Sequence, residues 1–542
     1  MENGEEVTVS NYLREMRHQL LPGDLHPFTD FDIPHLLQRQ ADVRGDHPFL
    51  IWEPFEGDRR TWTYADFVDA TRRVAAGLVA RGVQVGDRVL VHLDNCPESI
   101  FSWFACSVVG ASAVTTNARS VGDELAYYAE NAQVVGAITQ PRFAELVQES
   151  TNPGFLIVTE TDNGAPPAAG QAPAAVDSFD RLFESNPMDL RAPDPHLNFS
   201  VQFTSGTTSR PKGVVWNHAN ALWGARMCAR NEHLNANDVH LTHLPLFHTN
   251  AQAYSVLSSL WAGATVVAQP RFSASRFWEV SLRNRCTWSS IVPFCAKALM
   301  ARDEPVPDHQ YRMWGNGVQI PTWDDHFGLK TISWWGMTET ITQPIVTDPA
   351  VPSLPLSMGR PSPAYEISVR HDDGSAVGPG ETGGLFVRGR TGLSLFKEYL
   401  NNPEATEASF DDAGFMITGD RVKLLYSGDL QFGDRDKDML KVGGENVAAS
   451  EIERVVSSVP GVAECAVVAK RDPMLDEVPV VFVLVPAGSR PDTDRLGAEV
   501  LAACQASLAD FKVPREVRVV DELPRSTLEK VAKAKLRELA NE

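Results

Sequence analysis

Helix-like and strand-like hydrophobic patterns alternate between residues 62 and 140. Apolar residues recur at helical spacing over 64–82, and Gly82 is a residue at which helices commonly end. Residues 88–93 have the pattern of a strand, and residues 98–109 are again helical. This alternation predicts an α/β architecture built on a parallel sheet.

A run of charged residues at 434–438 interrupts the apolar pattern near the C-terminus. Beyond it, 465–469 and 480–485 have the pattern of strands, and 496–508 that of a helix. We therefore expect two domains, 1–434 and 435–542, joined by a short hinge, with the second a small α+β unit.

Two shorter patterns refine this organisation. Ser450 and Glu453 have the spacing of a capping box, which predicts that a short helix begins at Ser450. The Pro/Ala/Gly tract 164–175 is typical of an exposed loop rather than of a domain boundary.

Composition indicates a globular protein and excludes some partners. The 542 residues are too many for one ordinary core, and 43% hydrophobic with 22% charged residues is a common globular composition. A formal net charge of −21 argues against a general nucleic-acid binder, because phosphate backbones require excess Lys and Arg. Any site for ATP or a similar anion must therefore be locally basic.

Cellular location is inferred from the cysteines and the apolar stretches. The seven cysteines are scattered without a CxxC pair, which argues against a disulfide framework or a zinc site. The acidic N-terminus has no apolar core of a signal peptide, and the apolar stretch 100–114 is too short to span a membrane. We interpret that stretch as a buried helix and expect a cytoplasmic protein. The sequence leaves open whether it is a homodimer.

The most informative segment is the loop Thr204-Ser205-Gly206-Thr207-Thr208-Ser209-Arg210-Pro211-Lys212-Gly213. It lies between predicted strands at 199–203 and 214–216. Hydroxyls, glycine backbone N–H groups and a lysine bind phosphate oxygens, so the loop is a candidate polyphosphate site. It lacks the spacing of a Walker A loop, and composition alone fits a surface Ser/Thr/Gly turn equally well.

That loop resembles the phosphate-loop signature of the acyl-adenylate-forming (AMP-binding) superfamily, which contains acyl-CoA synthetases, peptide-synthetase adenylation domains and luciferases. Further motifs of the superfamily follow in its order, and together they cover about residues 35–535. They are Pro245-Leu246-Phe247-His248, Trp335-Gly336-Met337-Thr338-Glu339, Thr418-Gly419-Asp420, Gly433-Asp434-Arg435-Asp436-Lys437-Asp438, and Leu523-Pro524-Arg525-Ser526-Thr527 with Lys530.

The resemblance implies a fold and a reaction. The fold is a large multi-subdomain N-terminal α/β domain with a small mobile α+β C-terminal domain. In the reaction, a carboxylate attacks the α-phosphate of ATP, which gives an acyl-AMP and pyrophosphate, and the thiol of coenzyme A then displaces AMP. ATP, Mg²⁺ and coenzyme A are therefore the expected cofactors and co-substrate, and a small-molecule carboxylic acid is the expected partner.

Lys530 is the candidate catalytic cation. By resemblance, its ammonium bridges the substrate carboxylate and the α-phosphate, a task suited to a compact charge on a flexible chain. Without the motif, a solvated surface lysine would be the better interpretation. Glu529 stands where relatives often have glycine, which puts the detailed conformation of this loop in question.

Glu339 is the candidate magnesium ligand and Thr338 a candidate phosphate-binding hydroxyl. Mg²⁺ is commonly held by one or two carboxylates together with phosphates and waters. Glu339 alone could equally be a charge at a helix N-terminus. Trp335 is expected to supply one face for adenine, although core packing is the usual role of tryptophan.

The remaining nucleotide contacts also come from the resemblance. Asp420 should accept hydrogen bonds from the ribose hydroxyls, whereas out of context it would be a turn residue. The full set of expected cofactor-binding residues is Thr204, Ser205, Gly206, Thr207, Thr208, Lys212, Asn316, Gly317, Val318, Trp335, Gly336, Met337, Asp420, Phe432, Arg435, Lys441, Gly443 and Gly444.

The hinge residue is expected at Lys437. Rotation there would exchange Lys530 for the segment Lys441-Val442-Gly443-Gly444, which would line a tunnel for pantetheine. A strand-to-strand turn is the plain alternative for the paired glycines. His248 matches the position that controls thiol access in relatives, and a structural histidine is the alternative.

The acid is only partly defined by the sequence. Within the resembled superfamily, peptide-synthetase adenylation domains usually carry an Asp in this region for the amino group of the substrate. Residues 248–252 carry no acid, so the resemblance disfavours an amino-acid substrate. Acetate-type synthetases have Trp where Gly336 stands, so the resemblance implies an acyl pocket open to a medium-sized or bulky apolar acid. The stretches PLFHTNAQ and LPRSTLEKV resemble the carnitine- and bile-acid-CoA ligase-like branch. Two other functions remain open: transfer of the acyl group to a carrier protein, and a nucleotide-binding regulator without catalysis.

Overall fold

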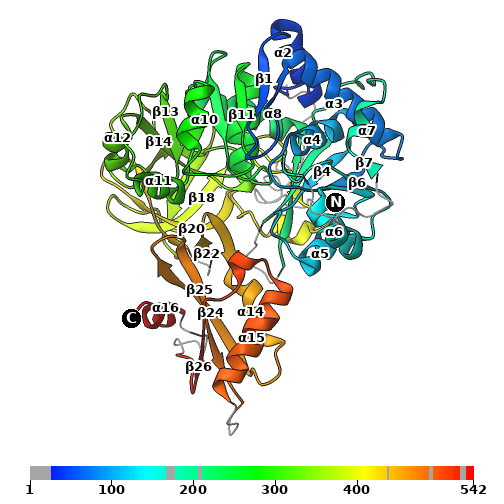
Figure 1. Ribbon diagram of the computed structural model, residues 1–542. Coiled ribbons are helices and arrows are strands. Elements are labelled where there is room, and N and C mark those ends of the chain that lie inside the picture. The colour runs from blue at the N-terminus through cyan, green and yellow to red at the C-terminus, as the bar shows by residue number, and fades with distance from the viewer. Residues whose placement is uncertain are drawn as a thin grey trace, which may run out of the picture.

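The computed structural model describes residues 26–166, 177–204, 210–435, 439–486, 492–524, 531 and 533–542. A large N-terminal α/β domain carries most of the chain, and a small C-terminal α+β domain lies below it in Figure 1. This arrangement is the predicted fold class, the adenylate-forming fold.

An eight-stranded sheet forms one half of the large domain. Strands β3 to β8 are parallel, whereas β9 is antiparallel to β8. The central strands β4 and β5 are buried along their whole length, as expected for a parallel sheet covered on both faces. The order is β19 (Glu398–Tyr399), β9 (Lys212–Asn217), β8 (Asn198–Thr204), β4 (Ser112–Thr115), β3 (Arg88–His92), β5 (Gly136–Thr139), β6 (Leu156–Val158) and β7 (Asp177–Ser178).

A thirteen-stranded sheet forms the other half. Its strands are parallel from β1 to β14 and antiparallel from β14 to β17, so the sheet changes character at β14. The order is β17 (Glu366–Arg370), β18 (Thr382–Arg388), β20 (Met416–Leu424), β21 (Leu430–Arg435), β16 (Ser357–Pro361), β15 (Ile345–Val346), β14 (Lys330–Trp335), β13 (Met313–Asn316), β12 (Trp288–Ser290), β10 (Val239–Thr242), β11 (Thr265–Ala268), β1 (Pro48–Trp52) and β2 (Arg60–Thr63).

The small domain has its own five-stranded sheet and its own core. Strand β21 ends at Arg435 in the large sheet, and the next described strand already belongs to the small one. Its strands are β22 (Met439–Val442), β23 (Glu445–Ala448), β24 (Glu464–Asp472), β25 (Asp476–Leu484) and β26 (Glu516–Val520). Valines and leucines of these strands pack on α14 (Ala449–Ser457) and α15 (Thr493–Ser507).

The helices of the large domain cover both sheets, and Figure 1 shows α4 beside strand β4, on which it packs. The α-helices not yet bounded are α2 (Ile33–Arg44), α3 (Tyr64–Val79), α4 (Pro97–Val109), α5 (Gly122–Ala132), α6 (Ala144–Thr151), α7 (Asp180–Phe183), α8 (His218–Asn231), α9 (Ser258–Ala262), α10 (Phe277–Arg283), α11 (Pro293–Met300), α12 (Pro321–Phe327), α13 (Pro403–Glu407) and α16 (Lys533–Asn541). Short helices of other types are η1 (Pro141–Phe143), η2 (Asn250–Leu257), η3 (Thr338–Thr340) and η4 (Asp510–Lys512).

The predicted elements are confirmed at α3, β3, α4, β8, β9, β24, β25 and α15. The single buried helix expected over 100–114 is wrong in its second part. Helix α4 ends at Val109, because Gly110 adopts a left-handed φ of 88°, and the chain then enters strand β4. Of the tract 164–175, residues 167–175 lie outside the described residues.

The short helix predicted near Ser450 is present as α14, which begins at Ala449, one residue before the expected start. The side chain of Ser450 lies outside the described part of the chain, so the capping box stays a prediction. Glu453 Oε1 accepts a hydrogen bond from the Val467 N–H at 2.8 Å and pairs with Lys533. Glu453 therefore also connects α14 to strand β24.

All seven cysteines lie in the described part of the chain as free thiols, and only Cys465 is not buried. Burial raises the pKa of Cys106, Cys295 and Cys504 to about 12. Among the described residues, no helix is long and apolar enough to cross a membrane.

Candidate functional site

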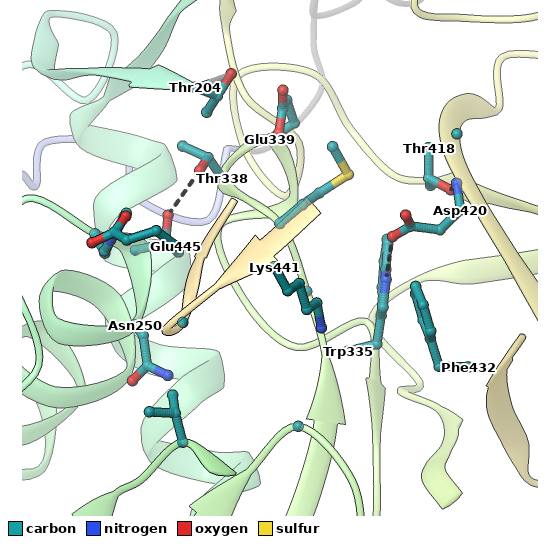
Figure 2. A pocket seen from close by; sticks show the side chains of 18 of the residues that line it. Thr204, Asn250, Trp335, Thr338, Glu339, Thr418, Asp420, Phe432, Lys441 and Glu445 are labelled. Atoms are coloured by element: carbon teal, nitrogen blue, oxygen red, sulfur yellow. Dashed lines mark hydrogen bonds and ion pairs between the residues drawn. The ribbon is translucent and has the colours of Figure 1, made fainter. Parts of the chain in front are cut away.

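A cavity of about 1710 Å³ opens between the two domains. Strand ends and loops of the large domain form most of its wall, and the turn between β22 and β23 of the small domain closes one side. Figure 2 shows Lys441 and Glu445 of the small domain directed toward the same space as Thr338 and Trp335 of the large domain. The two domains therefore contribute to one site.

The phosphate-loop candidate spans the end of β8 and the start of β9. Thr204 and Lys212 are partners in these antiparallel strands, and both line the cavity. Ser205, Gly206, Thr207 and Thr208 lie outside the described residues. The ammonium of Lys212 lies 4.6 Å from the ring centre of Tyr399, so the loop delivers a cation to the cavity wall.

Glu339 follows strand β14 and lies in the short helix η3. Its side chain is buried, and its Oε1 accepts a hydrogen bond from the Tyr399 hydroxyl at 2.7 Å. Burial raises the pKa of Glu339, while Tyr399 and Lys212 oppose that rise. A cation that binds beside this buried carboxylate would therefore stabilise its charged form.

The neighbouring backbone makes a strained turn. Ile341 has a φ of 63°, a region that β-branched residues rarely adopt. Three residues earlier, the Thr338 hydroxyl oxygen accepts a hydrogen bond from the Thr249 hydroxyl at 3.2 Å. Such strain persists only where the surrounding structure over-determines it, and it is concentrated at functional sites.

The fit of this site to magnesium can be tested on its donors. Among the described residues, no group of three or more His, Cys, Asp or Glu side chains could hold a metal ion on its own. Glu339 offers one buried carboxylate beside the cavity. This donor set fits Mg²⁺ that arrives with phosphate oxygens and waters as its other ligands.

The nucleotide-base candidates lie on β13, β14 and β20. The Trp335 indole N–H donates a hydrogen bond to Asp420 Oδ2 at 2.8 Å, as the dashed line in Figure 2 shows. Asn316 binds its own loop, because its side-chain oxygen accepts from Gly317 N–H and its amide donates to the Val318 carbonyl. Gly317, Val318, Met337 and Phe432 also line the cavity.

The expectation that Gly336 leaves an open acyl pocket is wrong for the space directly beside it. A Cβ at Gly336 would lie 2.4 Å from the Tyr254 hydroxyl and 2.5 Å from the Thr342 carbonyl oxygen. Tyr254 fills that space and donates a hydrogen bond to the Thr342 carbonyl at 3.0 Å. The glycine is needed for close packing, and Tyr254 sets the width of the cavity there.

The segment Lys441-Val442-Gly443-Gly444 forms a tight hairpin that points into the cavity. Gly443 and Gly444 have φ angles of 59° and 90°, as the turn between β22 and β23 requires. The Lys441 ammonium lies 5.3 Å from the ring centre of Phe432 in the large domain. The sequence offered two alternatives for this segment, a strand-to-strand turn and a lining of the ligand cavity. The structure shows that the segment is a turn and that it also lines the cavity.

His248 contacts the small domain directly. Its Nε2 lies 2.8 Å from Oε2 of Glu445, the first residue of β23. Burial lowers the pKa of His248, but the Glu445 carboxylate outweighs burial and raises it above the ordinary histidine value. The two side chains form an ion pair across the domain interface.

Besides the four phosphate-loop residues 205–208, three expected residues cannot be placed. Lys437 and Lys530 lie outside the described residues. Of Arg435, the structure describes the backbone, which pairs with Asp420 in strands β20 and β21.

Sequence reasoning missed Tyr399, Tyr254 and Glu445. Tyr399 could have been found by extending the sheet, because β19 pairs with β9, the strand that carries Lys212. Glu445 could have been found because it directly follows Gly443 and Gly444, where a charged side chain lies next to the expected ligand-binding turn. Tyr254 had no local signal, since it lies in the apolar helix η2.

A second cavity of about 610 Å³ lies on the same interface. Its lining includes Arg119 and Arg142 of the large domain and Arg515 of the small domain. The same lining holds two aspartates, because Asp94 pairs with Arg142 and Asp510 pairs with Arg119. The arginines therefore outnumber the carboxylates by one, and we call this space the arginine cavity.

Comparisons with known proteins agree with this geometry. Residues 37–400 match the family described as AMP-binding enzyme, and residues 451–530 match the AMP-binding enzyme C-terminal domain. A crotonobetaine/carnitine–CoA ligase of Salmonella paratyphi C is 32% identical over 516 residues, which are 92% of this chain and 97% of the ligase. The chain therefore belongs to the AMP-binding enzyme family.

Solved structures of o-succinylbenzoate CoA synthetase from Bacillus subtilis have the same fold at 27% identity. A double mutant bound to the product analogue OSB-NCoA has a TM-score of 0.80, over 94% of this chain and 98% of that one. The same enzyme in complex with AMP has a TM-score of 0.65, over 93% and 98%.

Proposed function

We propose that this protein is an AMP-forming acyl-CoA synthetase, an acid–thiol ligase. It activates a carboxylic acid with ATP to an acyl-AMP, releases pyrophosphate, and transfers the acyl group to coenzyme A with release of AMP. The observation that carries the proposal is the shared cavity. It joins Lys212, Glu339 and Asp420 of the large domain to the Lys441–Gly444 hairpin of the small one.

In the first half-reaction two anions must meet, so the site has to neutralise charge. Lys212, Thr204 and Thr338 bind the phosphates, together with Ser205, Gly206, Thr207 and Thr208 of the same loop. Lys530 bridges the carboxylate and the α-phosphate. Mg²⁺ bound at Glu339 would supply further positive charge to the phosphates.

The adenosine part is held at the other end of the cavity. Trp335 and the segment Asn316, Gly317 and Val318 face adenine, and Asp420 accepts from the ribose. The hydrogen bond from Trp335 to Asp420 supports this assignment, because it fixes the base and ribose positions relative to each other. Met337, Phe432 and Arg435 complete the nucleotide site.

The domain orientation corresponds to the second half-reaction. The boundary at 434/435 and a hinge at Lys437 would let the small domain present Lys530 in one state and Lys441–Gly444 in the other. The higher TM-score with the OSB-NCoA complex than with the AMP complex of the same enzyme supports this orientation. The contacts of Lys441 with Phe432 and of Glu445 with His248 support it independently.

Coenzyme A enters along the domain interface. The Gly443–Gly444 turn offers backbone without side chains, which suits the narrow pantetheine arm. His248 lines the same route and controls access of the thiol. The phosphates of coenzyme A would bind at the arginine cavity, where three arginines outnumber the two aspartates that pair with Arg119 and Arg142.

The acid is medium-sized or bulky and largely apolar. The cavity that Gly336 lines also has aromatic and aliphatic side chains in its wall, among them Tyr254, Trp334, Val318 and Met358. The relatives with matching length are named as CoA ligases, which supports coenzyme A rather than a carrier protein as acceptor.

A panel of carboxylic acids of increasing size tests the proposal. The purified protein is mixed with ATP, Mg²⁺, coenzyme A and one acid, and pyrophosphate, AMP and acyl-CoA are measured. At least one acid should give all three in equal amounts. Pyrophosphate and acyl-AMP without acyl-CoA, with transfer to a holo carrier protein, would favour the carrier-protein function. No pyrophosphate from any acid would favour a regulator.

Lys530→Ala separates the two half-reactions. Adenylation should fall by a factor on the order of 10²–10³, by analogy with the loss of a transition-state hydrogen-bond donor. Thioester formation from a supplied acyl adenylate should be much less affected, because that step needs no cation between carboxylate and phosphate. Equal losses in both steps would contradict the role of Lys530.

A further inference from the structure

Lys512 of the small domain lies buried between two carboxylates. It ends the short helix η4, and its ammonium lies 2.8 Å from Glu451 Oε1 on α14 of the same domain. It also forms an ion pair with Glu124 on α5 of the large domain. The side chains of Lys512, Glu124 and Glu451 are 8%, 7% and 4% exposed, so this Lys512 triad is shielded from water.

Rotation of the small domain would break one of the two ion pairs and leave the other intact. The pair with Glu451 lies inside the small domain and moves with it. The pair with Glu124 joins the domains and exists only while the interface is closed as described. A desolvated charge pair is highly sensitive to loss of one partner, because the other charge is then left buried without compensation.

The charge balance of the Lys512 triad adds to this sensitivity. Two carboxylates share one ammonium, and Glu451 Oε2 is buried without a hydrogen-bond partner among the residues that the structure describes. Burial and the nearby Glu124 raise the pKa of Glu451, whereas Lys512 lowers it only in part. The ammonium is therefore the group that allows Glu124 and Glu451 to approach each other at the interface.

The rim of the same interface has a second, weaker contact. Arg119 of the large domain pairs with Asp510 at 2.5 Å and lies 4.6 Å from the ring centre of Phe511. The Arg119 and Asp510 side chains are 47% and 73% exposed, so water and salt screen this pair. Arg119 and Asp510 also line the arginine cavity, so the Lys512 triad lies directly behind a wall of that cavity.

We infer that Lys512 is a positioning residue for the thioester-forming half-reaction, because its buried contact with Glu124 holds the small domain in the orientation that completes the coenzyme A site. The inference rests on the proposed function. Lys512 touches no substrate, and it acts by fixing the two walls of the arginine cavity and the Gly443–Gly444 turn relative to each other.

Glu124→Gln is the decisive variant. Glutamine keeps an oxygen for the Val121 N–H, which Glu124 caps at the start of α5, and removes only the charge. The Lys512–Glu451 pair is untouched, so the small domain retains its internal ion pair. We expect the KM for coenzyme A in the supplied acyl-adenylate assay to rise on the order of 10–100-fold, as for other buried cross-interface charge pairs.

Adenylation serves as the internal control. Pyrophosphate release by Glu124→Gln should stay within about twofold of wild type, which a general loss of folding would not allow. Glu499→Gln is the matched control, since it makes the same substitution in the exposed Arg495–Glu499 pair of the small domain, which lines neither cavity. It should change the KM for coenzyme A by less than about threefold, because exposed ion pairs contribute little.

The outcomes are distinct. A KM for coenzyme A in Glu124→Gln equal to wild type, or equal rises in Glu124→Gln and Glu499→Gln, would overturn the inference. Lys512→Arg, which keeps the charge, should retain more thioester formation than Lys512→Met, and the reverse order would also overturn it. If wild type itself forms no acyl-CoA from any acid, the proposed function fails rather than the role of Lys512.

Discussion

At the scale of single residues, one hydroxyl tunes the charge of a cavity carboxylate. Tyr399 donates to Glu339 at 2.7 Å, and its ring also lies beside the Lys212 ammonium. The same aromatic side chain thus connects the phosphate-loop lysine with the proposed magnesium ligand. Loss of the hydroxyl would change the protonation of Glu339 without removing the ring.

Tyr399→Phe should weaken adenylation and change its pH dependence. Burial raises the pKa of Glu339 and the tyrosine lowers it again, so the variant should have a still higher pKa. The acidic limb of the pyrophosphate-release profile should therefore move to higher pH. At neutral pH the rate should fall on the order of tenfold, since a hydrogen bond to a charged group contributes about 1.5–3 kcal/mol. An unchanged profile would contradict the assignment of Glu339.

Tyr254 is the residue expected to limit the size of the acid. Tyr254→Ala removes the ring beside Gly336 and should raise kcat/KM for the bulkiest acids relative to the shortest on the order of tenfold. The KM for ATP should stay near wild type, and Tm should fall because a buried aromatic is lost. A ratio of kcat/KM values unchanged across the acid series would show that Tyr254 does not border the acyl group.

The sequence could identify only those site residues that belong to a recognisable motif. Thr204, Lys212, Trp335, Glu339 and Asp420 line one cavity although they are far apart in sequence. Tyr254 could not be found this way, because an apolar helix gives no sign of which residue faces a ligand. The sequence also could not show that the space beside Gly336 is occupied by Tyr254, because a glycine gives no information about which distant residue packs against it.

At the scale of elements, the β22–β23 hairpin joins the small domain to the site. Gly444→Val should slow thioester formation more than tenfold, because a β-branched residue at a φ of 90° is strained and its side chain would narrow the pantetheine route. Pyrophosphate release should be nearly unchanged. The comparison uses both half-reactions of the same preparation.

Gly428→Val is the control for that hairpin. Gly428 has a φ of 85° in the turn between β20 and β21, and its added Cβ would meet no atom within 4 Å. The strain is similar but the position does not line the cavity, so both half-reactions should be close to wild type. A similar loss of thioester formation in both variants would mean that strain alone explains the effect.

Elements with strong periodicity could be predicted, and those shaped by distant contacts could not. Helix α3 and strands β8 and β9 follow directly from their apolar spacing. The stretch 100–114 was predicted as one helix, although it contains the end of α4 and strand β4. Both elements are buried on all sides, so neither has the alternation of apolar and polar residues that distinguishes a helix from a strand. The hydrogen bond of Glu453 to strand β24 is such a distant contact, which no local pattern around α14 indicates.

At the scale of the whole molecule, catalysis requires one cavity to serve two reactions in turn. Lys437→Pro should restrict the exchange, because proline fixes φ near −65°, with a range of about 15°, at the proposed hinge. One half-reaction should survive and the other should collapse, with the surviving one indicating which orientation is trapped. Pyrophosphate release and thioester formation from supplied acyl adenylate are measured separately.

The reverse result is equally informative. A folded Lys437→Pro protein with both half-reactions near wild type would place the hinge elsewhere between β21 and β22. Sequence patterns could predict that two domains exist, because the charged run at 434–438 separates two apolar units. They could not predict the orientation, since it depends on contacts such as His248 with Glu445 that join distant segments.

The buried thiols make domain motion directly observable. Since six of the seven cysteines are buried, maleimide dyes should label wild type slowly, and Cys465→Ser removes the one less buried thiol. New cysteines at Tyr426 of the large domain and Leu539 of the small domain, which are 87% and 38% exposed, would then carry a donor and an acceptor. Energy transfer between them would change as acid and ATP, and then coenzyme A, are added, so that each turnover could be followed in single molecules.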